Sequence, residues 1–468
     1  MNSAEKRFDT IVVGAGIAGL GVAGLLQRAG QKVLLVDRYG QVGGRMQSWT
    51  YRDEWLLDVG LHAVEMGEFG GGNILIEKVG KKVKWGERYC EKMIIYSPED
   101  KQWRDLGARL AKTKNGIREY FRVMKIIQEI TDEELDPWDG RSLKDWFREN
   151  VRHEIVEEMI ANAGMLCTTV LETEEMSAGE CLWIMRENMR HAKPGNIIRS
   201  SYPEGGMQGM MDPLKDAFVE AGGTLYLNSP VEEILFDGTK AVGVAIGRSV
   251  APYQDAWNQP ERKVIGADRV VCALPLWDLG NVLPLDGGES PLPEWWVKRI
   301  KDIRMETTGL IGYMIGLSEP LFDDVEFRTA LKLKRTGTPF QGYAPSNHMK
   351  GIAPEGKMII HSDIVVEIPQ IQDRFEMNRL LEAMWEEMVT DMWPGMEEKV
   401  EWRIPYKCIG CDGLARKPMQ TGKFKPDVKA PEIEGLYFAG DTYRGRGIGI
   451  NAAANSAMLC AETVLQGG

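Results

Sequence analysis

The chain has 468 residues, 43% hydrophobic and 27% charged, with a formal net charge of −12. This composition is typical of a globular protein and excludes a disordered or collagen-like chain. The negative balance argues against a general affinity for nucleic acid or anionic lipid, and no run approaches the roughly 20 apolar residues that span a bilayer. At roughly 100–200 residues per domain, the length predicts two or three domains, or one core built from separate segments.

The amino terminus and the cysteines indicate a cytoplasmic protein. Residues 1–7 are polar and lead directly into a predicted strand, unlike a secretory signal. The seven cysteines are scattered from Cys90 to Cys460, which fits reduced thiols better than a disulfide framework. Cys408 and Cys411 form the one C-x-x-C spacing. Because a zinc site would need a second ligand pair nearby, we interpret them as two loop thiols and expect no metal site.

The first predicted elements form a dinucleotide-binding unit. Residues 8–13 predict a buried strand, and residues 20–29 predict a helix. Between them Gly14 allows a tight turn, Gly16 lets the backbone approach a pyrophosphate, and Gly19 permits close packing of helix and strand. The helix amino terminus offers free N–H groups to phosphate. The predicted site is therefore the whole G-x-G-x-x-G run, Gly14, Ala15, Gly16, Ile17, Ala18 and Gly19.

A second predicted strand, residues 32–37, ends in an acid. Asp37 follows Gly19 by 18 residues, where a carboxylate accepts hydrogen bonds from both hydroxyls of an adenosine ribose and a 2′-phosphate would be repelled. We include the adjacent Arg38 in the predicted nucleotide site.

Two further motifs resemble the flavin-containing amine oxidase and phytoene desaturase superfamily. Gly43-Gly44-Arg45 comes soon after the acid, and the D-x-G-x-H sequence of residues 58–62 follows one hairpin later. In that superfamily the glycine pair and arginine lie along the FAD pyrophosphate, and D-x-G-x-H runs beside the isoalloxazine ring. The resemblance implies that Gly44 and Arg45 bind phosphate and that three residues approach the flavin: Gly60, Leu61 and His62.

The far end of the chain carries a second FAD signature of the superfamily. Residues 435–441 predict a strand, and a glycine-rich turn then precedes an alanine-rich helix over 452–464. The resemblance places Gly440 and Asp441 at the ribityl and pyrophosphate groups. The positive end of the helix would stabilise the negative charge of reduced flavin, next to the turn residues Gly447, Ile448 and Asn451.

A third block lies in the middle of the chain. A P-x-G-G-M sequence at 203–207 is followed by a predicted helix and strand, and Val231 inherits from the superfamily a backbone contact with the adenine side. The implied fold is α/β: a discontinuous Rossmann-like FAD-binding domain with an inserted α+β substrate domain, a mixed sheet plus helices. We expect residues 1–90, 203–283 and 428–468 in the FAD-binding domain, and residues 91–202 and 284–427 in the substrate domain.

The two insertions predict different secondary structure. Residues 91–202 read as helical, including a helix over 117–130. In the second insertion, 308–317 and 357–366 predict strands. Residues 372–393 predict an amphipathic helix whose apolar side carries Phe375, Leu380, Leu381, Met384, Trp385 and Met388.

The substrate is expected where the inserted domain covers the flavin, because ligand sites favour domain interfaces. The chain carries 24 Met and 14 Trp, side chains that adapt to bulky apolar ligands, although core packing is the alternative for any one of them. Trp295 and Trp296 lie beside Lys298 and Arg299 and are candidates for an interfacial membrane anchor. Peripheral membrane contact is therefore an alternative to a purely cytoplasmic location.

Flavin dehydrogenation needs few protein groups, because the cofactor itself accepts the hydride. A motif places His62 beside the flavin, and Tyr443 and Arg444 occupy the turn before the flavin-facing helix. These three residues are the catalytic candidates. Some amine oxidases attach FAD through a cysteine in the last glycine-rich block, but this block has none before Cys460. We therefore expect noncovalent FAD.

Several functions remain open at this point. The first is an FAD-dependent dehydrogenase or desaturase that transfers hydride from an apolar, cyclic or polyene substrate to flavin N5. The second is an isomerase or saturase in which reduced flavin returns hydride to carbon. Oxidation of amines or porphyrinogens is a further alternative, since the Tyr443-Arg444-Gly445 turn resembles protoporphyrinogen oxidases. A non-enzymatic binding protein, like the Rab GDP-dissociation inhibitors, is the last. The motifs do not indicate the substrate, the electron acceptor or the oligomeric state.

Overall fold

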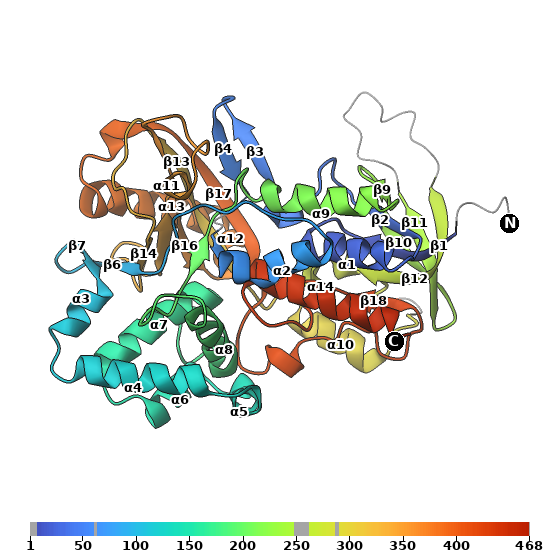
Figure 1. Ribbon diagram of the computed structural model, residues 1–468, viewed down its shortest axis with the longest axis horizontal. Helices are drawn as coiled ribbons and strands as arrows, with labels where there is room; N and C mark the ends of the chain where they lie inside the picture. Colours follow the sequence, from blue (N-terminus) through green and yellow to red (C-terminus); the bar gives the residue numbers. More distant parts are fainter. Residues whose placement is uncertain (1–6, 60–62, 248–261, 286–289, 468) are drawn as a thin grey trace.

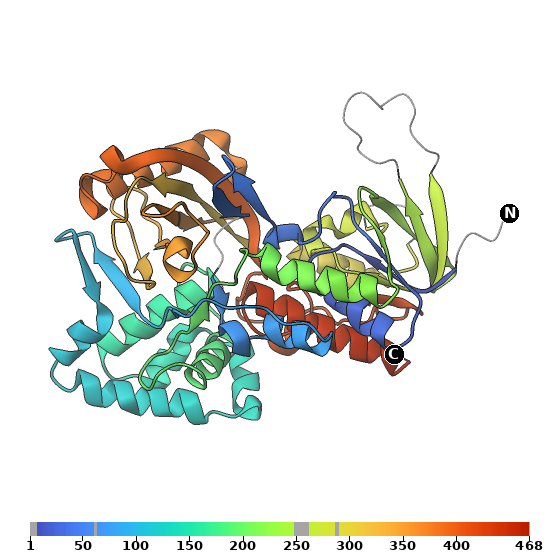
Figure 2. The ribbon, with the colours of Figure 1, turned by 45° about the horizontal axis from the view of Figure 1, so that its top comes forward.

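The structure, a computed structural model, describes residues 7–59, 63–247, 262–285 and 290–467. It has three parts, which Figures 1 and 2 show from two directions. A largely parallel sheet with its helices lies at the right of Figure 1, a second sheet at the upper left, and a lobe of helices at the lower left.

The first sheet is assembled from separate segments of the chain. Its strand order is β10-β11-β12-β1-β2-β9, with β18 beside β12. The neighbours of β1 and β2, and the pair of β12 with β18, are parallel, as in a Rossmann fold, whereas β10, β11 and the start of β12 pair in antiparallel fashion. The strands are β1 (Phe8–Val13), β2 (Val33–Val36), β9 (Thr224–Tyr226), β10 (Val231–Asp237), β11 (Lys240–Ile246), β12 (Lys263–Cys272) and β18 (Leu436–Phe438).

Both faces of this sheet are buried, which explains the uninterrupted apolar strands. Val12 on β1 packs in the core on the side of α1, whereas its neighbours Ile11 and Val13 belong to a second core that includes Ile300 of α10. The helices around the sheet are α1 (Ile17–Arg28), α2 (Gly71–Lys78), α9 (Gln208–Glu220), α10 (Glu294–Ile303) and α14 (Gly449–Leu465).

In the tryptophan pair at the start of α10, the candidate membrane anchor, one ring is buried and the other is exposed. Trp296 is 4% exposed, and its ring stacks on Phe438 of β18 with centroids 5.4 Å apart. Only Trp295 is exposed, and its indole N–H donates to the Glu432 carboxylate at 3.4 Å. Because successive residues of a helix point in different directions, one indole reaches the core while its neighbour faces water. Among the described residues, no helix combines the length and apolar character needed to cross a membrane.

The second sheet has seven strands in the order β17-β13-β16-β15-β14-β6-β7. Strand β7 at one edge and its neighbour β6 fall within residues 91–202, which were expected to be helical, so that expectation was wrong for this part of the segment. Strand β6 joins by parallel pairing with β14, a tertiary contact that no periodicity in so short a segment indicates. The strands are β6 (Met93–Ser97), β7 (Gln102–Asp105), β13 (Thr307–Leu317), β14 (Phe327–Ala330), β15 (Phe340–Tyr343), β16 (Met358–Val366) and β17 (Val400–Leu414).

One face of this sheet is covered by α12 (Ile368–Gln372) and α13 (Arg374–Glu387). Leu380, Leu381, Met384, Trp385 and Met388 are buried as expected, but Phe375 is 88% exposed. The Asp373 carboxylate accepts hydrogen bonds from the amides of Phe375 and Glu376. The helix start is therefore set by this cap and not by burial of Phe375.

The lobe of helices packs below the second sheet in Figure 1. The expected helix over 117–130 is present as α4, and Met165, Met176 and Met185 are buried in the core. The helices are α3 (Leu106–Ala111), α4 (Gly116–Glu129), α5 (Asp132–Leu135), α6 (Leu143–Asn150), α7 (Glu154–Thr168) and α8 (Ala178–Met189).

Candidate active site

The G-x-G-x-x-G loop leaves open space at one of its glycines. Gly14 has φ +100°, and a Cβ on Gly19 would lie 1.8 Å from the Gly14 carbonyl oxygen, so the fold itself requires these two glycines. Gly16 has an ordinary φ of −73°, and a Cβ there would meet nothing nearer than the Gly43 carbonyl oxygen at 4.0 Å. The side chains of Ile17 and Ala18 are buried in the core. Gly16 therefore offers bare backbone to a ligand, as a pyrophosphate requires.

The carboxylate of Asp37 holds this loop in place. It accepts hydrogen bonds from the amide of Ala15 at 2.6 Å and from that of Tyr39 at 2.8 Å, and burial raises the pKa of Asp37. Arg38 is an exposed neighbour that forms an ion pair with Asp278 at 3.4 Å. Val231 starts β10 nearby, since the amide of Ser229 donates to the Asp37 carbonyl at 2.8 Å.

The glycine pair and Arg45 connect the first predicted FAD block to the last. The amide of Gly43 donates to the Ala15 carbonyl at 2.8 Å, and a Cβ on Gly44 would lie 3.5 Å from the Gly16 Cα. The Arg45 guanidinium donates to both carboxylate oxygens of Asp441, at 2.7 and 2.8 Å. Burial lowers the pKa of Arg45, but the Asp441 carboxylate outweighs it and raises that pKa above its ordinary value.

Two buried cations bind backbone carbonyls of the glycine-rich turn that precedes α14. The Lys425 ammonium donates to the carbonyls of Asp441 and Gly445 at 2.9 and 3.0 Å, and burial lowers the pKa of Lys425 to about 8. The fully buried Arg416 donates to the Gly447 carbonyl at 2.6 Å. Neither cation carries a motif, so the sequence offered no signal for them.

Arg446 links the same turn to the helical lobe. Its guanidinium pairs with Asp139 at 2.7 Å and with Glu180 at 3.1 Å, and both carboxylates are fully buried. Arg446→Ala leaves two buried carboxylates unpaired, and we expect it to lower the free energy of unfolding in urea by about 3–5 kcal/mol. Arg444→Ala is the matched control, because Arg444 pairs with Asp427 where both side chains are nearly half exposed. Its expected cost is below about 1 kcal/mol, and equal costs for the two variants would contradict this assignment.

Of the three predicted catalytic residues, the structure describes Tyr443 and Arg444. Tyr443 is fully buried, its ring stacks on Phe438 at 5.1 Å, and its hydroxyl donates to the Leu274 carbonyl at 3.1 Å. Arg444 is nearly half exposed, and its guanidinium pairs with the Asp427 carboxylate at 3.0 Å. Gly60, Leu61 and His62 lie outside the described residues.

Three further predicted cofactor residues surround the start of α14. Gly440 has φ +140°, a conformation that favours glycine, and Ile448 is the residue that immediately precedes the helix. The Asn451 side chain bonds within the protein: its amide donates to the Glu65 carbonyl at 3.0 Å, and its oxygen accepts from the Gly72 amide at 3.1 Å. Asn451 thus connects α14 to Glu65 of β5 and to the first turn of α2.

A row of polar residues crosses the second sheet on the face away from α13. Tyr406, Gly312, Asp363, Gln341 and Thr329 are register partners on five neighbouring strands. The Tyr406 hydroxyl donates to Asp363 at 2.7 Å, and a Cβ on Gly312 would lie 2.6 Å from the Asp363 Cβ. Burial raises the pKa of Asp363 to about 7. Sequence analysis missed this row, although an acid within the apolar strand over 358–366 was a usable signal.

Five buried polar atoms, two of them in this row, are among those with no hydrogen-bond partner in the described residues: Asp363 Oδ1, Thr329 Oγ1, Glu65 Oε2, Ser200 Oγ and Ser201 Oγ. The last three belong to a paired ladder of β5 (Val64–Glu65) and β8 (Ser200–Ser201). Burial raises the pKa of Glu65 to about 8. Since buried polar groups are nearly always satisfied, these atoms indicate a place for water or a ligand.

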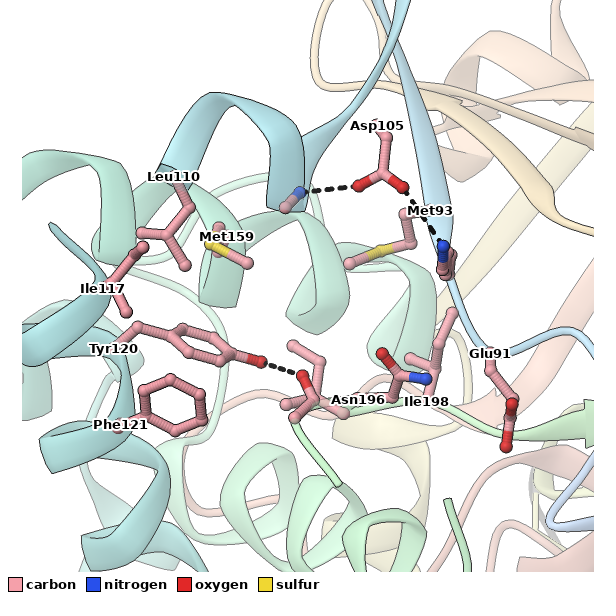
Figure 3. A pocket seen from close by; sticks show the side chains of 14 residues that line it. Glu91, Met93, Asp105, Leu110, Ile117, Tyr120, Phe121, Met159, Asn196 and Ile198 are labelled. Atoms are coloured by element: carbon pink, nitrogen blue, oxygen red, sulfur yellow. Dashed lines mark hydrogen bonds and ion pairs between the residues drawn. The ribbon is translucent and has the colours of Figure 1, made fainter. Parts of the chain in front are cut away.

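An apolar cavity of about 410 Å³ opens where β6 and β7 meet α3, α4 and α7. Figure 3 shows the aromatic rings of Tyr120 and Phe121 facing Met159 and Ile198 across it, and the Tyr120 hydroxyl donates to the Gly195 carbonyl at 2.6 Å. Phe121 is 59% exposed. The segment that lines the cavity at 195–198 continues directly into Ser200 and Ser201 of β8. Within the described chain, no group of three or more acidic, histidine or cysteine side chains could hold a metal ion.

Comparison with known proteins gives one consistent relationship. The family model for flavin-containing amine oxidoreductases matches residues 17–465. The 15-cis-phytoene desaturase of Narcissus pseudonarcissus is 23% identical over 99% of this chain and 80% of its own length, and prolycopene isomerase 1 of an Oncidium hybrid cultivar is 23% identical over 98% and 84%. The crystal structure of an oxidoreductase from Methanosarcina mazei superposes with a TM-score of 0.76 at 20% identity and covers 98% of this chain and 99% of its own.

Proposed function

Since the chain belongs to the flavin-containing amine oxidoreductase family, we propose that it is an FAD-dependent dehydrogenase or desaturase of an apolar, cyclic or polyene substrate. The observation that carries this proposal is the open backbone at Gly16, against which Gly44 lies. Arg45 of the first FAD block also binds Asp441 of the last. Segments far apart in the sequence therefore meet around one place that suits a dinucleotide.

These residues would hold FAD without a covalent bond. The backbone of the G-x-G-x-x-G loop and the start of α1 would face the pyrophosphate, with Arg45 beside it. Asp37 would bind the ribose hydroxyls, Val231 would lie at the adenine, and the turn from Gly440 to Ile448 would lie along the ribityl chain and ring. When bound, FAD supplies a two-electron acceptor for hydride.

The protein's own groups would manage the proton that leaves the substrate. Asp363 and Glu65 are buried carboxyls that exchange a proton near neutral pH, since burial raises their pKa values to about 7 and about 8. A general base works best when its pKa is close to the working pH. We assign the proton to Asp363, which Tyr406 holds in place, because its free Oδ1 lies on the sheet face away from α13.

The apolar cavity supports an apolar substrate. Leu110, Ile117, Phe121 and Met159 in its lining would accept hydrocarbon, and the lining also includes polar side chains, Glu91, Lys92, Asp105 and Asn196. Two relatives are named for acting on phytoene and prolycopene, which supports a polyene in this chain as well. The exposed Ile117 and Phe121 at the cavity would also favour peripheral contact with a membrane, as a source of such a substrate.

The visible spectrum of the purified protein tests this proposal. Under anaerobic conditions we expect a flavin spectrum that bleaches when a carotenoid precursor or cyclic diene is added, and that is unchanged by amines or porphyrinogens. Bleaching of the flavin by an amine would contradict the apolar substrate and assign to the protein another reaction of the same family, the oxidation of amines. A protein that binds no flavin, even after reconstitution with FAD, would contradict the cofactor proposal.

A second candidate is flavin-dependent isomerisation, which the similarity to prolycopene isomerase supports. The flavin spectrum of such an enzyme would not bleach when substrate is added, because isomerisation transfers no net electrons from the substrate to the flavin. The enzyme would instead convert its substrate only after the flavin is prereduced. Product analysis with oxidised and with prereduced enzyme separates the two candidates.

A further inference from the structure

Both Cys408 and Cys411 belong to β17, so their interpretation as loop thiols was wrong: Cys408 pairs with Leu310, and Cys411 lies in a bulge that follows Ile409. Ile409 pairs with Gly309 and Leu414 with Thr307, so five steps along β17 (409 to 414) face two along β13 (307 to 309), and three extra residues bulge out. In a regular strand, residues three apart point to opposite faces and lie about 10 Å apart. The bulge instead brings the two thiols into hydrogen-bond contact.

The two thiols have different protonation. Cys411 donates its hydrogen bond to Cys408, and this bond together with the positive charge of Arg45 lowers the pKa of Cys408 in spite of its burial. The same bond, with burial, raises the pKa of Cys411. Of the two thiols, Cys408 is therefore the one that loses its proton more readily, as the nucleophilic member of a thiol pair does.

The bulge touches both ends of the proposed FAD site. The Arg45 guanidinium, which binds Asp441, also donates to the carbonyl of Gly410 between the two cysteines. A Cβ on Gly449, the first residue of α14, would lie 3.8 Å from the Cys411 carbonyl oxygen. Cys408 and Cys411 are half-buried, whereas the other five cysteines are buried. The thiol pair thus lies against the residues that we propose to hold the flavin.

We propose that Cys408 and Cys411 form a redox-active dithiol that exchanges two electrons with FAD. This inference rests on the proposed binding of FAD. When the dithiol is oxidised, a bond forms between the two sulfurs, both thiols lose their protons, and FAD takes up the two electrons and two protons to become FADH2. In the reverse direction the disulfide accepts two electrons from FADH2. Each chain then stores four electrons, two on the flavin and two on the sulfurs.

Anaerobic titration of the oxidised holoenzyme with dithionite tests this proposal by counting electrons. We expect four electrons per flavin for the unaltered protein and two for Cys408→Ser and for Cys411→Ser, either of which suffices if the other fails to fold. Cys460→Ala is the matched control: Cys460 is fully buried in α14, and this variant should still take four. Alkylation of the denatured protein gives a second readout. In the oxidised protein we expect two fewer of the seven cysteines to be alkylated without prior reduction than after reduction.

Two results would overturn the dithiol. One is an uptake of two electrons per flavin by the unaltered protein, with all cysteines alkylated without reduction. The other is a denatured chain whose mass includes the flavin, which would assign one cysteine to a thioether bond. A protein with no flavin spectrum would overturn the proposed function instead, and this is seen before any electron is added.

Discussion

Gly16→Ala should weaken the binding of FAD about 100-fold and leave the fold intact. The new methyl group would have no protein atom within about 4 Å, and φ of −73° is ordinary for alanine. The protein therefore has no need of glycine here, and the methyl group would occupy the space of the pyrophosphate. A 100-fold loss corresponds to about 2.7 kcal/mol of binding free energy. Titration of apoprotein with FAD, followed by flavin fluorescence, measures it.

Two other glycines serve as controls for this prediction. Gly266→Ala on β12 places a methyl group 3.8 Å from its nearest neighbour, and it should change neither FAD affinity nor thermal stability. Gly19→Ala would push a methyl group to 1.8 Å from a backbone oxygen, and it should destabilise the protein even without FAD. If Gly16→Ala binds FAD as tightly as the unaltered protein, the pyrophosphate does not lie at this glycine.

Asp363→Asn should slow flavin reduction by substrate at least about 100-fold, since a positioned general base contributes roughly 10²–10⁴-fold. The carboxyl of Asp363 is protonated below its pKa of about 7, and only the anion can accept a proton. The rate in the unaltered protein should therefore rise with pH to a plateau above pH 7, and Asp363→Asn should remove this dependence. Anaerobic stopped-flow absorbance between pH 5 and 9 measures both effects.

Tyr406→Phe is the matched variant for Asp363. It removes the hydroxyl that stabilises the anion, so the pH midpoint should move above 7 while the plateau rate is largely kept. A rate for Asp363→Asn equal to that of the unaltered protein would exclude Asp363 as the proton acceptor and leave Glu65 as the remaining buried carboxyl with a pKa near neutral.

As the pH rises through the pKa of Asp363, the stability of the folded protein should fall while its activity rises. The pKa of this carboxyl in the folded protein, about 7, exceeds the ordinary value of 3.8, so the folded state binds the proton more tightly than the unfolded state. This contribution is complete below pH 3.8 and is lost as the pH rises through 7. Asp363→Asn should therefore raise the unfolding temperature above pH 7, which a misfolded variant would not do.

The sequence by itself determined the cofactor end of the protein, because those signals are local. Gly14 must have a positive φ, and the backbone next to Gly19 leaves no room for a Cβ. The spacing of these glycines is set by a single turn between one strand and one helix. The apolar runs that became β1, β2 and β16 are equally local, since burial of both faces requires them. The α/β fold and the family could be predicted from these features alone.

Only the tertiary structure decided how the interior is built. Thr329, Gln341, Asp363 and Tyr406 are ordinary polar residues in four separate strands, and pairing in register makes them one row. Tyr443 and Arg444 are adjacent in a motif, yet one is fully buried and the other is nearly half exposed, because successive side chains of a turn point in different directions. The pairing of the two β17 thiols likewise depends on three residues inserted against β13, which no spacing in the sequence reveals. Such contacts join segments tens to hundreds of residues apart. They stabilise the protein only once the chain has folded, so no local sequence pattern records them.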